Sequence, residues 1–265
     1  ASNLQNLLNS IKKFKATTFA AIPATLTKFI KFENSDLKNN FSDIRLVITN
    51  STSIPKNTIQ IFREILVNGN LATYYGLTEA SRSTFMIFQE DSSRDNSVGK
   101  PAAGVSIKID DSSNNEILIK GKNVISKYWK NENADKNIID GWLRTGDTGF
   151  LDNENYLFLK SRKDDIINIG GEKVIPMEIE EVVKQIPEVI DVVAFGIKNE
   201  IFGQVIKLQV IKSKESNLEK SKILIHCIKN LEKFKIPNKI EFVEEIPKTS
   251  YGKVKRFMLK WENDM

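Results

Sequence analysis

The chain has 265 residues, of which 40% are hydrophobic and 28% charged. This composition is typical of a soluble globular protein with one large or two modest domains. The net charge of +5 comes from 39 basic and 34 acidic residues mixed along the chain, with no basic patch interleaved with aromatic residues. The sequence therefore argues against a nucleic-acid-binding protein. No apolar run reaches the length of a membrane span, so a transmembrane protein is not expected either.

The chain contains one cysteine, Cys227, and one histidine, His226. A single cysteine excludes an intrachain disulfide and fits a reducing compartment, so we expect a cytoplasmic protein. Cys227 lies at helical spacing with Leu224, Ile228 and Leu231, which predicts a core position, whereas His226 falls off that face and is expected in solvent. With one residue of each type, a zinc site of ordinary composition is not expected.

Residues 1–98 have the pattern of a parallel α/β unit. Helical periodicity and short apolar runs alternate, predicting helix, strand, helix, strand, helix and strand over residues 4–11, 17–19, 23–32, 44–49, 55–66 and 71–75. Strand, helix, strand in this order indicates parallel pairing. The ends of such strands are where open α/β sheets place their ligands.

From residue 99 the pattern changes twice. Short strands separated by the turns DDSSNN and DNEN predict a small β-rich subdomain up to residue 162, with strands at 105–109, 116–120 and 156–160. Residues 163–265 then have the pattern of a compact α+β domain, whose helices and strands are predicted at 176–186, 192–195, 206–210, 218–231, 240–243 and 253–261. The fold class is thus α/β: a partial N-terminal domain of two subdomains, followed by an α+β C-terminal domain.

Residues 140–173 contain the densest group of polar and glycine residues. Arg144, Thr145, Gly146 and Asp147 are predicted to form a turn with a cation, a hydroxyl and a carboxylate, which suits a ligand with vicinal hydroxyls because one carboxylate accepts hydrogen bonds from both. Arg162 is a planar donor that could bind a sugar or a phosphate. A loop with a structural aspartate cap explains the same residues equally well.

Gly170 and Gly171 are flanked by the apolar residues Ile167, Ile169 and Val174. The pattern predicts a hairpin whose turn needs positive φ or a close backbone approach to a partner.

Several of these motifs together are similar to one known family. GWLRTGD, SRKDD and INIGGEKVIPMEIE follow one another between residues 141 and 180, with YYGLTEAS upstream at 74–81 and PKTSYGKVKR downstream at 247–256. Their type and order resemble the adenylate-forming superfamily of acyl-CoA synthetases, peptide-synthetase adenylation domains and luciferases. The resemblance extends over essentially the whole chain.

The resemblance implies roles for the residues after the strand at 71–75. Tyr75 would stack on adenine, Gly76 would belong to the nucleotide-binding set, Thr78 would contact phosphate, and Glu79 would hold Mg²⁺, for which a carboxylate is the right ligand type. Without the resemblance, Tyr75 is better interpreted as a buried strand aromatic.

The same resemblance assigns roles further along the chain. Asp147 and Arg162 would bind the nucleotide, with Asp147 in the ribose-binding loop. Asp164 would be the hinge about which the C-terminal domain swings, although residues 163–165 could also form a solvated linker. Lys253 would be the catalytic lysine that bridges the attacking carboxylate and the α-phosphate. By frequency alone, a lysine is a solvated surface group.

Gly170, Gly171 and Lys173 would form the face presented after the rotation of the C-terminal domain.

Three departures from the family pattern concern the backbone. Asn155 and Ser161 stand where glycine is usual, and residues 50–53 replace a small loop that passes the adenine and the acyl pocket. That polar stretch could equally cap the following helix.

The implied reaction has two halves: a carboxylic acid and ATP give an acyl-adenylate with Mg²⁺, and a thiol of coenzyme A or carrier-bound pantetheine then displaces AMP. The family's Ser/Thr/Gly-rich phosphate loop is absent. We therefore expect the C-terminal half of a longer enzyme, inactive or nearly so without its missing N-terminal half. Two alternatives stay open: a non-catalytic module that binds AMP or an acyl carrier protein, and the adenylation domain of a peptide synthetase.

Overall fold

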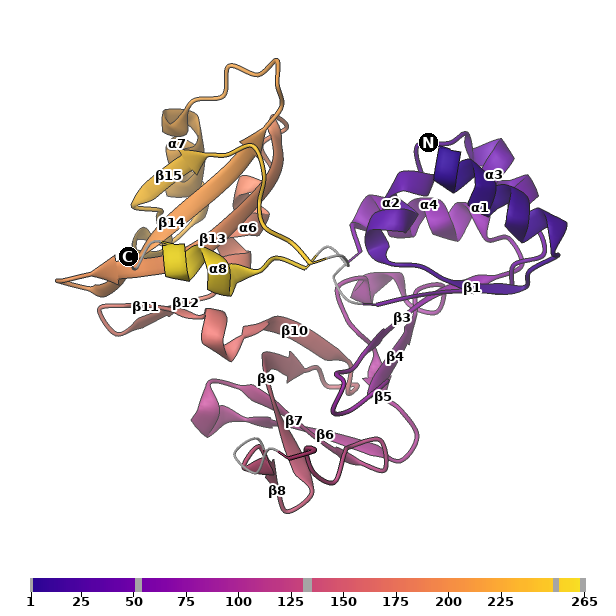
Figure 1. Ribbon diagram of the computed structural model, residues 1–265, viewed down its shortest axis with the longest axis horizontal. Coiled ribbons are helices and arrows are strands. Elements are labelled where there is room, and N and C mark those ends of the chain that lie inside the picture. Colours follow the sequence, from indigo (N-terminus) through magenta and orange to yellow (C-terminus); the bar gives the residue numbers. More distant parts are fainter. Residues whose placement is uncertain (1, 51–53, 131–134, 250–252, 263–265) are drawn as a thin grey trace. The chain divides into compact units, whose positions relative to one another are not determined.

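A computed structural model describes residues 2–50, 54–130, 135–249 and 253–262 of the chain (Figure 1). The chain forms two compact units. The first comprises Ala1–Thr145 and Gly149–Leu159, and the second Gly146–Thr148 and Lys160–Met265. The expected α/β fold class is confirmed, whereas the division of the N-terminal part at residues 98 and 162 stays a prediction.

The first unit begins with a five-stranded sheet of order β1-β2-β3-β4-β5. Its strands are β1 (Thr18–Ala20), β2 (Leu46–Thr49), β3 (Asn70–Tyr75), β4 (Thr84–Ile87) and β5 (Lys100–Pro101). The first three are parallel and the last two antiparallel, so the predicted parallel unit is confirmed. Four helices cover one face of β1 to β3 (Figure 1), namely α1 (Ser2–Lys13), α2 (Pro23–Phe29), α3 (Asn34–Asn40) and α4 (Lys56–Ile65).

The core of this sheet forms because the helices are apolar on one side. Ile59, Phe62 and Ile65 of α4 are fully buried, and they join Val47 and Leu71 of the sheet in one cluster. After α4 the chain turns sharply at Gly69, where a Cβ atom would lie 2.1 Å from the carbonyl oxygen of Ile44. Only glycine allows this approach, which brings β3 beside β2.

The first unit also contains most of a second sheet, of order β10-β9-β7-β6 with β8 paired to β9. Its strands are β6 (Val105–Asp110), β7 (Glu116–Gly121), β8 (Ile138–Ile139), β9 (Trp142–Leu151) and β10 (Leu157–Arg162), and short 3-10 helices occur at Ser92–Arg94 and Asp111–Ser113. The predicted strands at 105–109, 116–120 and 156–160 are present. Asn155, which stands where the family usually has glycine, has a φ of 66°, in the left-handed region that asparagine tolerates.

One local prediction for this sheet is wrong. Residues 144–147 do not form a separate turn, because they lie inside the ten-residue strand β9. Gly146, with φ of 70°, is a local irregularity within that strand. Ser161 lies in strand β10, so serine is tolerated where the family usually has glycine.

The second unit is built on a sheet of order β12-β11-β14-β13, with β15 paired to β14. Its strands are β11 (Ile167–Ile169), β12 (Glu172–Val174), β13 (Val189–Asn199), β14 (Gly203–Lys212) and β15 (Lys239–Phe242), and its helices are α6 (Pro176–Val183), α7 (Lys220–Asn230) and α8 (Arg256–Glu262). Further 3-10 helices lie at Lys163–Asp165 and Lys233–Lys235. Strand β13 is buried on both faces: Val192 and Ala194 pack in a cluster with α6 and α7, whereas Val193 and Phe195 pack in another with Leu259 of α8.

Helix α7 differs in detail from the prediction. Cys227 is buried, as expected, but it shares its face with Ile223, while Leu224 and Ile228 are 36% and 55% exposed. His226 is half-buried rather than in solvent, and its Nε2 lies 3.1 Å from the carbonyl oxygen of Val182. The helix packs against α6 along a narrower face than the hydrophobic pattern indicated.

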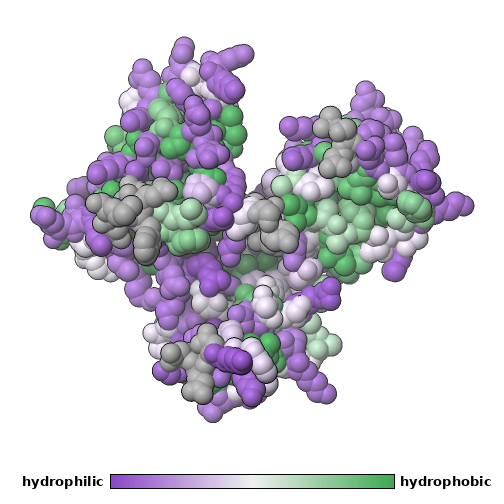
Figure 2. All heavy atoms as spheres, viewed as in Figure 1, coloured by the Kyte–Doolittle hydropathy of each residue, from purple (hydrophilic) through white to green (hydrophobic). Residues whose placement is uncertain are grey.

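Hydrophobic side chains also reach the surface of each unit, as the green areas of Figure 2 show. Those with the largest exposed fractions include Trp129 at 84% and Ile201 at 82%. Among the helices of the described part of the chain, none is both long and apolar enough to cross a bilayer.

Candidate functional site

The first group of predicted site residues lies directly after β3. Reciprocal backbone hydrogen bonds of 3.0 and 3.2 Å between Leu77 and Ala80 close a tight turn. Thr78 and Glu79 are the two central residues of that turn, and Thr78 is exposed. A Cβ atom at Gly76 would lie 2.5 Å from the backbone nitrogen of Arg82, so glycine is required here by the fold of the turn.

Tyr75 lies in the interior of the first unit. Its side chain is 8% exposed and belongs to an apolar cluster with Ala80, Ile117 and Leu157. This burial agrees with the interpretation of a buried strand aromatic. The adenine-stacking role stays a prediction.

Glu79 has a side-chain partner that the sequence did not indicate. The hydroxyl of Tyr128 donates a hydrogen bond of 3.1 Å to Oε1 of Glu79. Desolvation, and then this contact with a carboxylate, raise the pKa of Tyr128 above 10.0. The backbone of Glu79 is fixed as well, because its carbonyl accepts from the amide of Ile125 at 2.9 Å.

Asp147 and Arg162 belong to the second unit and lie on the neighbouring strands β9 and β10. Nη1 of Arg162 is 3.4 Å from Oδ1 of Asp147, and the two side chains are 40% and 13% exposed. A side chain at Gly146 would come within 3.2 Å of Nη2 of Arg162. The glycine therefore leaves room for the guanidinium beside the strand, and a hydroxyl-bearing ligand could meet a carboxylate and a planar donor together.

The Gly170–Gly171 pair forms the predicted hairpin turn. Strands β11 and β12 pair with Ile169 opposite Glu172, so the loop has two residues, with φ values of 58° and 99°. The amide of Gly170 donates to the carbonyl of Phe202 at 2.9 Å, which holds this turn against the β13–β14 hairpin. Lys173 lies on the exposed side of β12.

Lys253 lies before the closing helix, which begins at Arg256, in a short antiparallel pairing of residues 247–249 with residues 253–255. These two described arms are called the Lys253 hairpin. The carbonyl of Lys253 accepts from the amide of Thr249 at 2.8 Å, and its own amide donates to Oγ1 of Thr249 at 3.1 Å. The side chain of Lys253 is exposed. Tyr251 and Gly252, which belong to the same motif, lie outside the described residues.

Asp164 is the middle residue of the 3-10 helix Lys163–Asp165. Its side chain is exposed, and its carbonyl accepts a hydrogen bond of 2.6 Å from Nζ of Lys260. The neighbouring Asp165 pairs with Arg256 at 3.4 Å. The hinge candidate is therefore held by α8, a contact that no local pattern in the sequence indicates.

Arg144, predicted as a ligand-binding cation, is paired within the protein. Its Nη2 lies 2.8 Å from both Oδ2 of Asp110 and Oε2 of Glu116. The second of these carboxylates is almost fully buried, so the pair neutralises a charge that would otherwise be costly. Hydrogen bonds to Asp110 and then Glu116 raise the pKa of Arg144.

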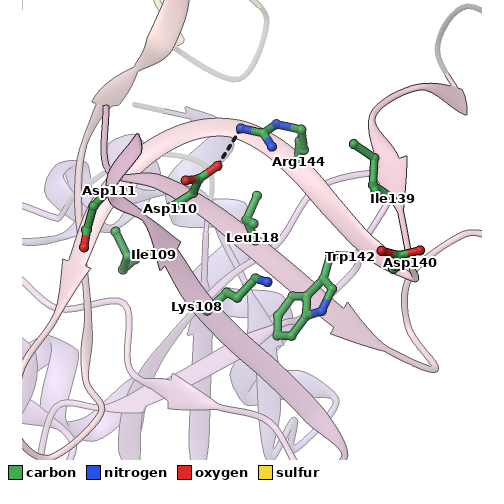
Figure 3. Close-up of a pocket in the computed structure, with 9 residues that line it drawn as sticks. All are labelled: Lys108, Ile109, Asp110, Asp111, Leu118, Ile139, Asp140, Trp142 and Arg144. Atoms are coloured by element: carbon green, nitrogen blue, oxygen red, sulfur yellow. Dashed lines mark hydrogen bonds and ion pairs between the residues drawn. The ribbon is translucent and has the colours of Figure 1, made fainter. Parts of the chain in front are cut away.

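A hollow of about 340 Å³ lies beside this pair (Figure 3). Trp142 forms part of its wall, and the ammonium groups of Lys108 and Lys120 lie 4.3 and 5.8 Å from the centre of its ring. Nζ of Lys120 also donates to the carbonyl of Asp140 at 2.9 Å. Two of the charged groups that line this hollow, Arg144 and Asp110, are paired with each other, and the ammonium of Lys108 lies over Trp142, which indicates a structural role for the Gly-Trp part of the motif.

The polar stretch after β2 is described only at its edges. Nδ2 of Asn50 donates to the hydroxyl of Tyr74 at 2.7 Å, so the ends of β2 and β3 are joined by side chains. Residues 51–53, predicted either as a helix cap or as a loop near the nucleotide, lie outside the described residues.

Within the ranges that the structure describes, no three His, Cys, Asp or Glu side chains are grouped so that they could hold a metal ion. Mg²⁺ does not need such a group, because it is usually bound by one or two carboxylates together with substrate phosphates and water. Glu79 fits this requirement, because its carboxylate has a second oxygen besides the one that accepts from Tyr128.

Two sequence models of AMP-binding enzymes match the chain. That of the AMP-binding enzyme covers residues 2–129, and that of the AMP-binding enzyme C-terminal domain covers residues 178–253. Indoleacetate–CoA ligase of Aromatoleum aromaticum is 31% identical over 262 residues, which cover 94% of this chain and 50% of that protein. A long-chain-fatty-acid–CoA ligase of Haemophilus influenzae is 32% identical and is covered to 48%, with 98% of this chain aligned.

A similar structure is that of o-succinylbenzoate CoA synthetase from Bacillus subtilis, in complex with its acyl-adenylate intermediate. It matches with a TM-score of 0.84 and 27% identity, over 97% of this chain and 53% of that one. The same enzyme in complex with ATP and a magnesium ion matches with a TM-score of 0.83. The chain spans about half the length of the curated relatives it matches. These matches confirm what the motifs predicted: the chain belongs to the adenylate-forming superfamily of AMP-binding enzymes.

Proposed function

We propose that this chain is the nucleotide-handling half of an AMP-forming acid–thiol ligase. The observation that carries the proposal is the Asp147–Arg162 pair, in which a half-exposed guanidinium and a carboxylate lie 3.4 Å apart on adjacent strands. Such a pair presents an acceptor for vicinal hydroxyls beside a donor for ribose or phosphate oxygens. The similarity to an enzyme solved with an acyl-adenylate supports AMP as the ligand.

The residues after β3 handle the rest of the nucleotide. Tyr75 supports the adenine, Gly76 keeps the backbone of the turn close to the ligand, and Thr78 donates its hydroxyl to a phosphate oxygen. Glu79 holds Mg²⁺, which when bound would neutralise charge on the phosphates. The exposed position of Thr78 and the hydrogen-bonded position of Glu79 on one tight turn support these roles.

Lys253 supplies the positive charge at the reacting centre. Its ammonium group can stabilise the charge that develops as the carboxylate attacks the α-phosphate. Asp164 is the hinge for the change between the two half-reactions. Gly170, Gly171 and Lys173 then form the face that meets the thiol acceptor, which is supported by the exposed two-residue turn between β11 and β12.

The substrate is a small-molecule carboxylic acid, and the acceptor is coenzyme A or a carrier-bound pantetheine. The names of the relatives, which include ligases of indoleacetate and of long-chain fatty acids to CoA, favour coenzyme A. Catalysis requires a partner, the N-terminal half with its phosphate-binding loop, and we expect this chain alone to be inactive in adenylation. The enzyme works in the cytoplasm.

A second candidate is a non-catalytic module that binds AMP or an acyl carrier protein, and a third is the adenylation domain of a peptide synthetase. The presence of Lys253 together with Asp147, Arg162 and Glu79 favours an enzyme, because a module that only binds AMP has no need for the reacting lysine.

The test combines binding and catalysis. AMP binding to the chain is measured by calorimetry for the unmodified protein, for Asp147→Ala and for Asp43→Asn, a control that removes an exposed carboxylate of the first unit. Loss of binding only in Asp147→Ala is expected. Carboxylate-dependent ATP–pyrophosphate exchange is then assayed over fatty, aromatic and amino acids, with the chain alone and joined to an upstream half. Exchange only in the joined enzyme supports the ligase; binding without exchange in either form favours the binding module.

A further inference from the structure

Helix α8 connects the hinge candidate to the segment that contains Lys253. Its residues Arg256 and Lys260 are four positions apart, so they project from the same side of the helix. Nη1 of Arg256 lies 3.4 Å from Oδ2 of Asp165, and Nζ of Lys260 lies 2.6 Å from the carbonyl oxygen of Asp164 and 3.8 Å from Oδ1 of Asp165. Two cations of one helix therefore hold the short 3-10 helix Lys163–Asp165.

The Lys253 hairpin continues into the same helix without an intervening loop. The amide of Lys255 donates to the carbonyl of Pro247 at 2.9 Å, and the amide of Met258 donates to the carbonyl of Lys255 at 3.0 Å. The first arm of the hairpin is held by an ion pair between Lys248 and Asp191 of β13. Any displacement of α8 is therefore transmitted to the backbone of Lys253.

The orientation of Arg256 is fixed from its other side by Glu180 of α6. Nη2 of Arg256 lies 2.6 Å from Oε1 of Glu180, and this carboxylate is 8% exposed and also accepts from the amide of Ala194 at 2.8 Å. A buried carboxylate with one cationic partner holds that partner firmly, because separation would leave the charge uncompensated. The planar guanidinium then presents its second edge to Asp165.

We propose that Asp165 is a positioning residue for Lys253: through Arg256 and Lys260 it holds α8, and with it residues 247–249 and 253–255, in one rigid piece that begins at Asp165. The proposal rests on the roles assigned above to Asp164 and Lys253. Its consequence is that the change of backbone dihedrals between the half-reactions takes place at Asp164 or before it, while the position of Lys253 relative to Asp165 is kept. Asp165 need not touch the substrate to affect the reaction, because a misplaced catalytic group costs rate.

The first test needs no substrate. Hydrogen exchange of the backbone amides is measured by NMR on the chain carrying Asp165→Asn, which keeps the Arg256–Glu180 pair and so is expected to fold. The amides of Thr249 and Lys255 are expected to exchange about fivefold faster than in the unmodified chain, because the hairpin loses one of its anchors. Amides of the β13–β14 ladder are expected to keep their rates. Asp165→Glu, which retains the carboxylate, is expected to restore the slow exchange.

Two further variants separate positioning from general destabilisation. Arg256→Lys retains the positive charge but loses the planar guanidinium that contacts two carboxylates at once. Its amides of Thr249 and Lys255 are expected to exchange as fast as those of Asp165→Asn. Glu181 is an exposed neighbour of Glu180 on α6, so Glu181→Gln serves as the control. This variant is expected to leave the exchange rates of the hairpin amides unchanged. Unchanged exchange at Thr249 and Lys255 in both Asp165→Asn and Arg256→Lys would overturn the proposal, and so would equally accelerated exchange throughout the sheet.

The second test uses the chain joined to its upstream half. In pyrophosphate exchange, Asp165→Asn is expected to lower kcat about tenfold with little change in the KM for ATP, because Asp165 positions Lys253 without binding the nucleotide. If the unmodified enzyme shows no exchange, the proposed function is wrong while the amide result still stands. If exchange is present and its kcat is unaffected by Asp165→Asn, the positioning role is wrong while the proposed function stands.

Discussion

The hydroxyl of Tyr128 donates to the carboxylate of Glu79 across 49 residues of sequence, at a distance of 3.1 Å. The contact ties a residue beyond β7 to the turn that follows β3, and it orients the side chain proposed to hold Mg²⁺. It also makes the pKa of Tyr128 depend on the charge of Glu79, and this pKa can be followed by ultraviolet absorption.

We expect Glu79→Ala to lower the pKa of Tyr128 while leaving it above 10.0, because desolvation is the larger cause of the shift and the carboxylate the second. Ultraviolet difference titration of each protein against its Tyr128→Phe counterpart isolates this hydroxyl. Because the folded state keeps the proton longer than the unfolded state, stability should decline as the pH rises above 10.0, less steeply in Glu79→Ala. An unchanged pKa in that variant would contradict the contact.

Replacing the second glycine of the β11–β12 hairpin should reduce the stability of the protein more than replacing the first. Gly171 has φ of 99°, outside the region that other residues adopt, and a Cβ atom there would meet no heavy atom within 4 Å. Gly171→Ala should therefore cost about 1–3 kcal/mol through backbone strain alone. Gly170 has φ of 58°, which asparagine tolerates, so Gly170→Asn is the milder matched control. Chemical denaturation measures the free energy of unfolding of both variants. If both lose the same free energy of unfolding, backbone conformation does not determine the loss of stability.

Cys227 should be inert in the folded protein. Burial raises the pKa of its thiol from 9.0 to about 11, and only the thiolate reacts with disulfide reagents. Labelling at neutral pH should be at least about a hundredfold slower than in denaturant, because it requires local opening of the structure. The chain has one cysteine, so the whole signal belongs to this residue. Rapid labelling of the folded protein would contradict its burial.

The same shift predicts a loss of stability in alkali. Since the folded pKa of Cys227 is raised, its contribution is present below pH 9.0 and is lost as the pH rises towards about 11. At about 1.4 kcal/mol per pKa unit, the loss approaches about 3 kcal/mol. Cys227→Ala should remove this part of the pH dependence in urea titrations at successive pH values.

Asp91 offers a test in acid. Its pKa is lowered from 3.8 to about 2, first by the hydroxyl of Ser93 and then by Arg94. Ser93→Ala should raise this pKa towards 3.8, and Ser92→Ala, the neighbouring serine, should leave it unchanged. Carboxyl NMR titration measures both variants. Because a lowered pKa stabilises the folded state above 3.8 and the effect is lost as the pH falls towards 2, Ser93→Ala should also weaken the acid dependence of stability.

Features that depend on local conformation and on hydrophobic periodicity could be predicted from the amino-acid pattern. The parallel strands β2 and β3 follow from short apolar runs around an amphipathic helix, and the left-handed Asn155 and the Gly170–Gly171 turn follow from residues that tolerate positive φ. The family follows from the order of the motifs, and the comparisons confirm it. The nucleotide-binding roles of Tyr75, Asp147 and Lys253 stay predictions.

The pairing of charged side chains, by contrast, depends on how the chain packs in three dimensions. Arg144 was predicted as a ligand cation because its neighbours suit a binding turn, yet it pairs with Asp110 and Glu116, 34 and 28 residues away along the chain. Arg256 finds Glu180 and Asp165 at separations of 76 and 91 residues. Ion pairs of this kind form where the packing of sheets and helices brings side chains together and removes water, and no local pattern encodes that coincidence.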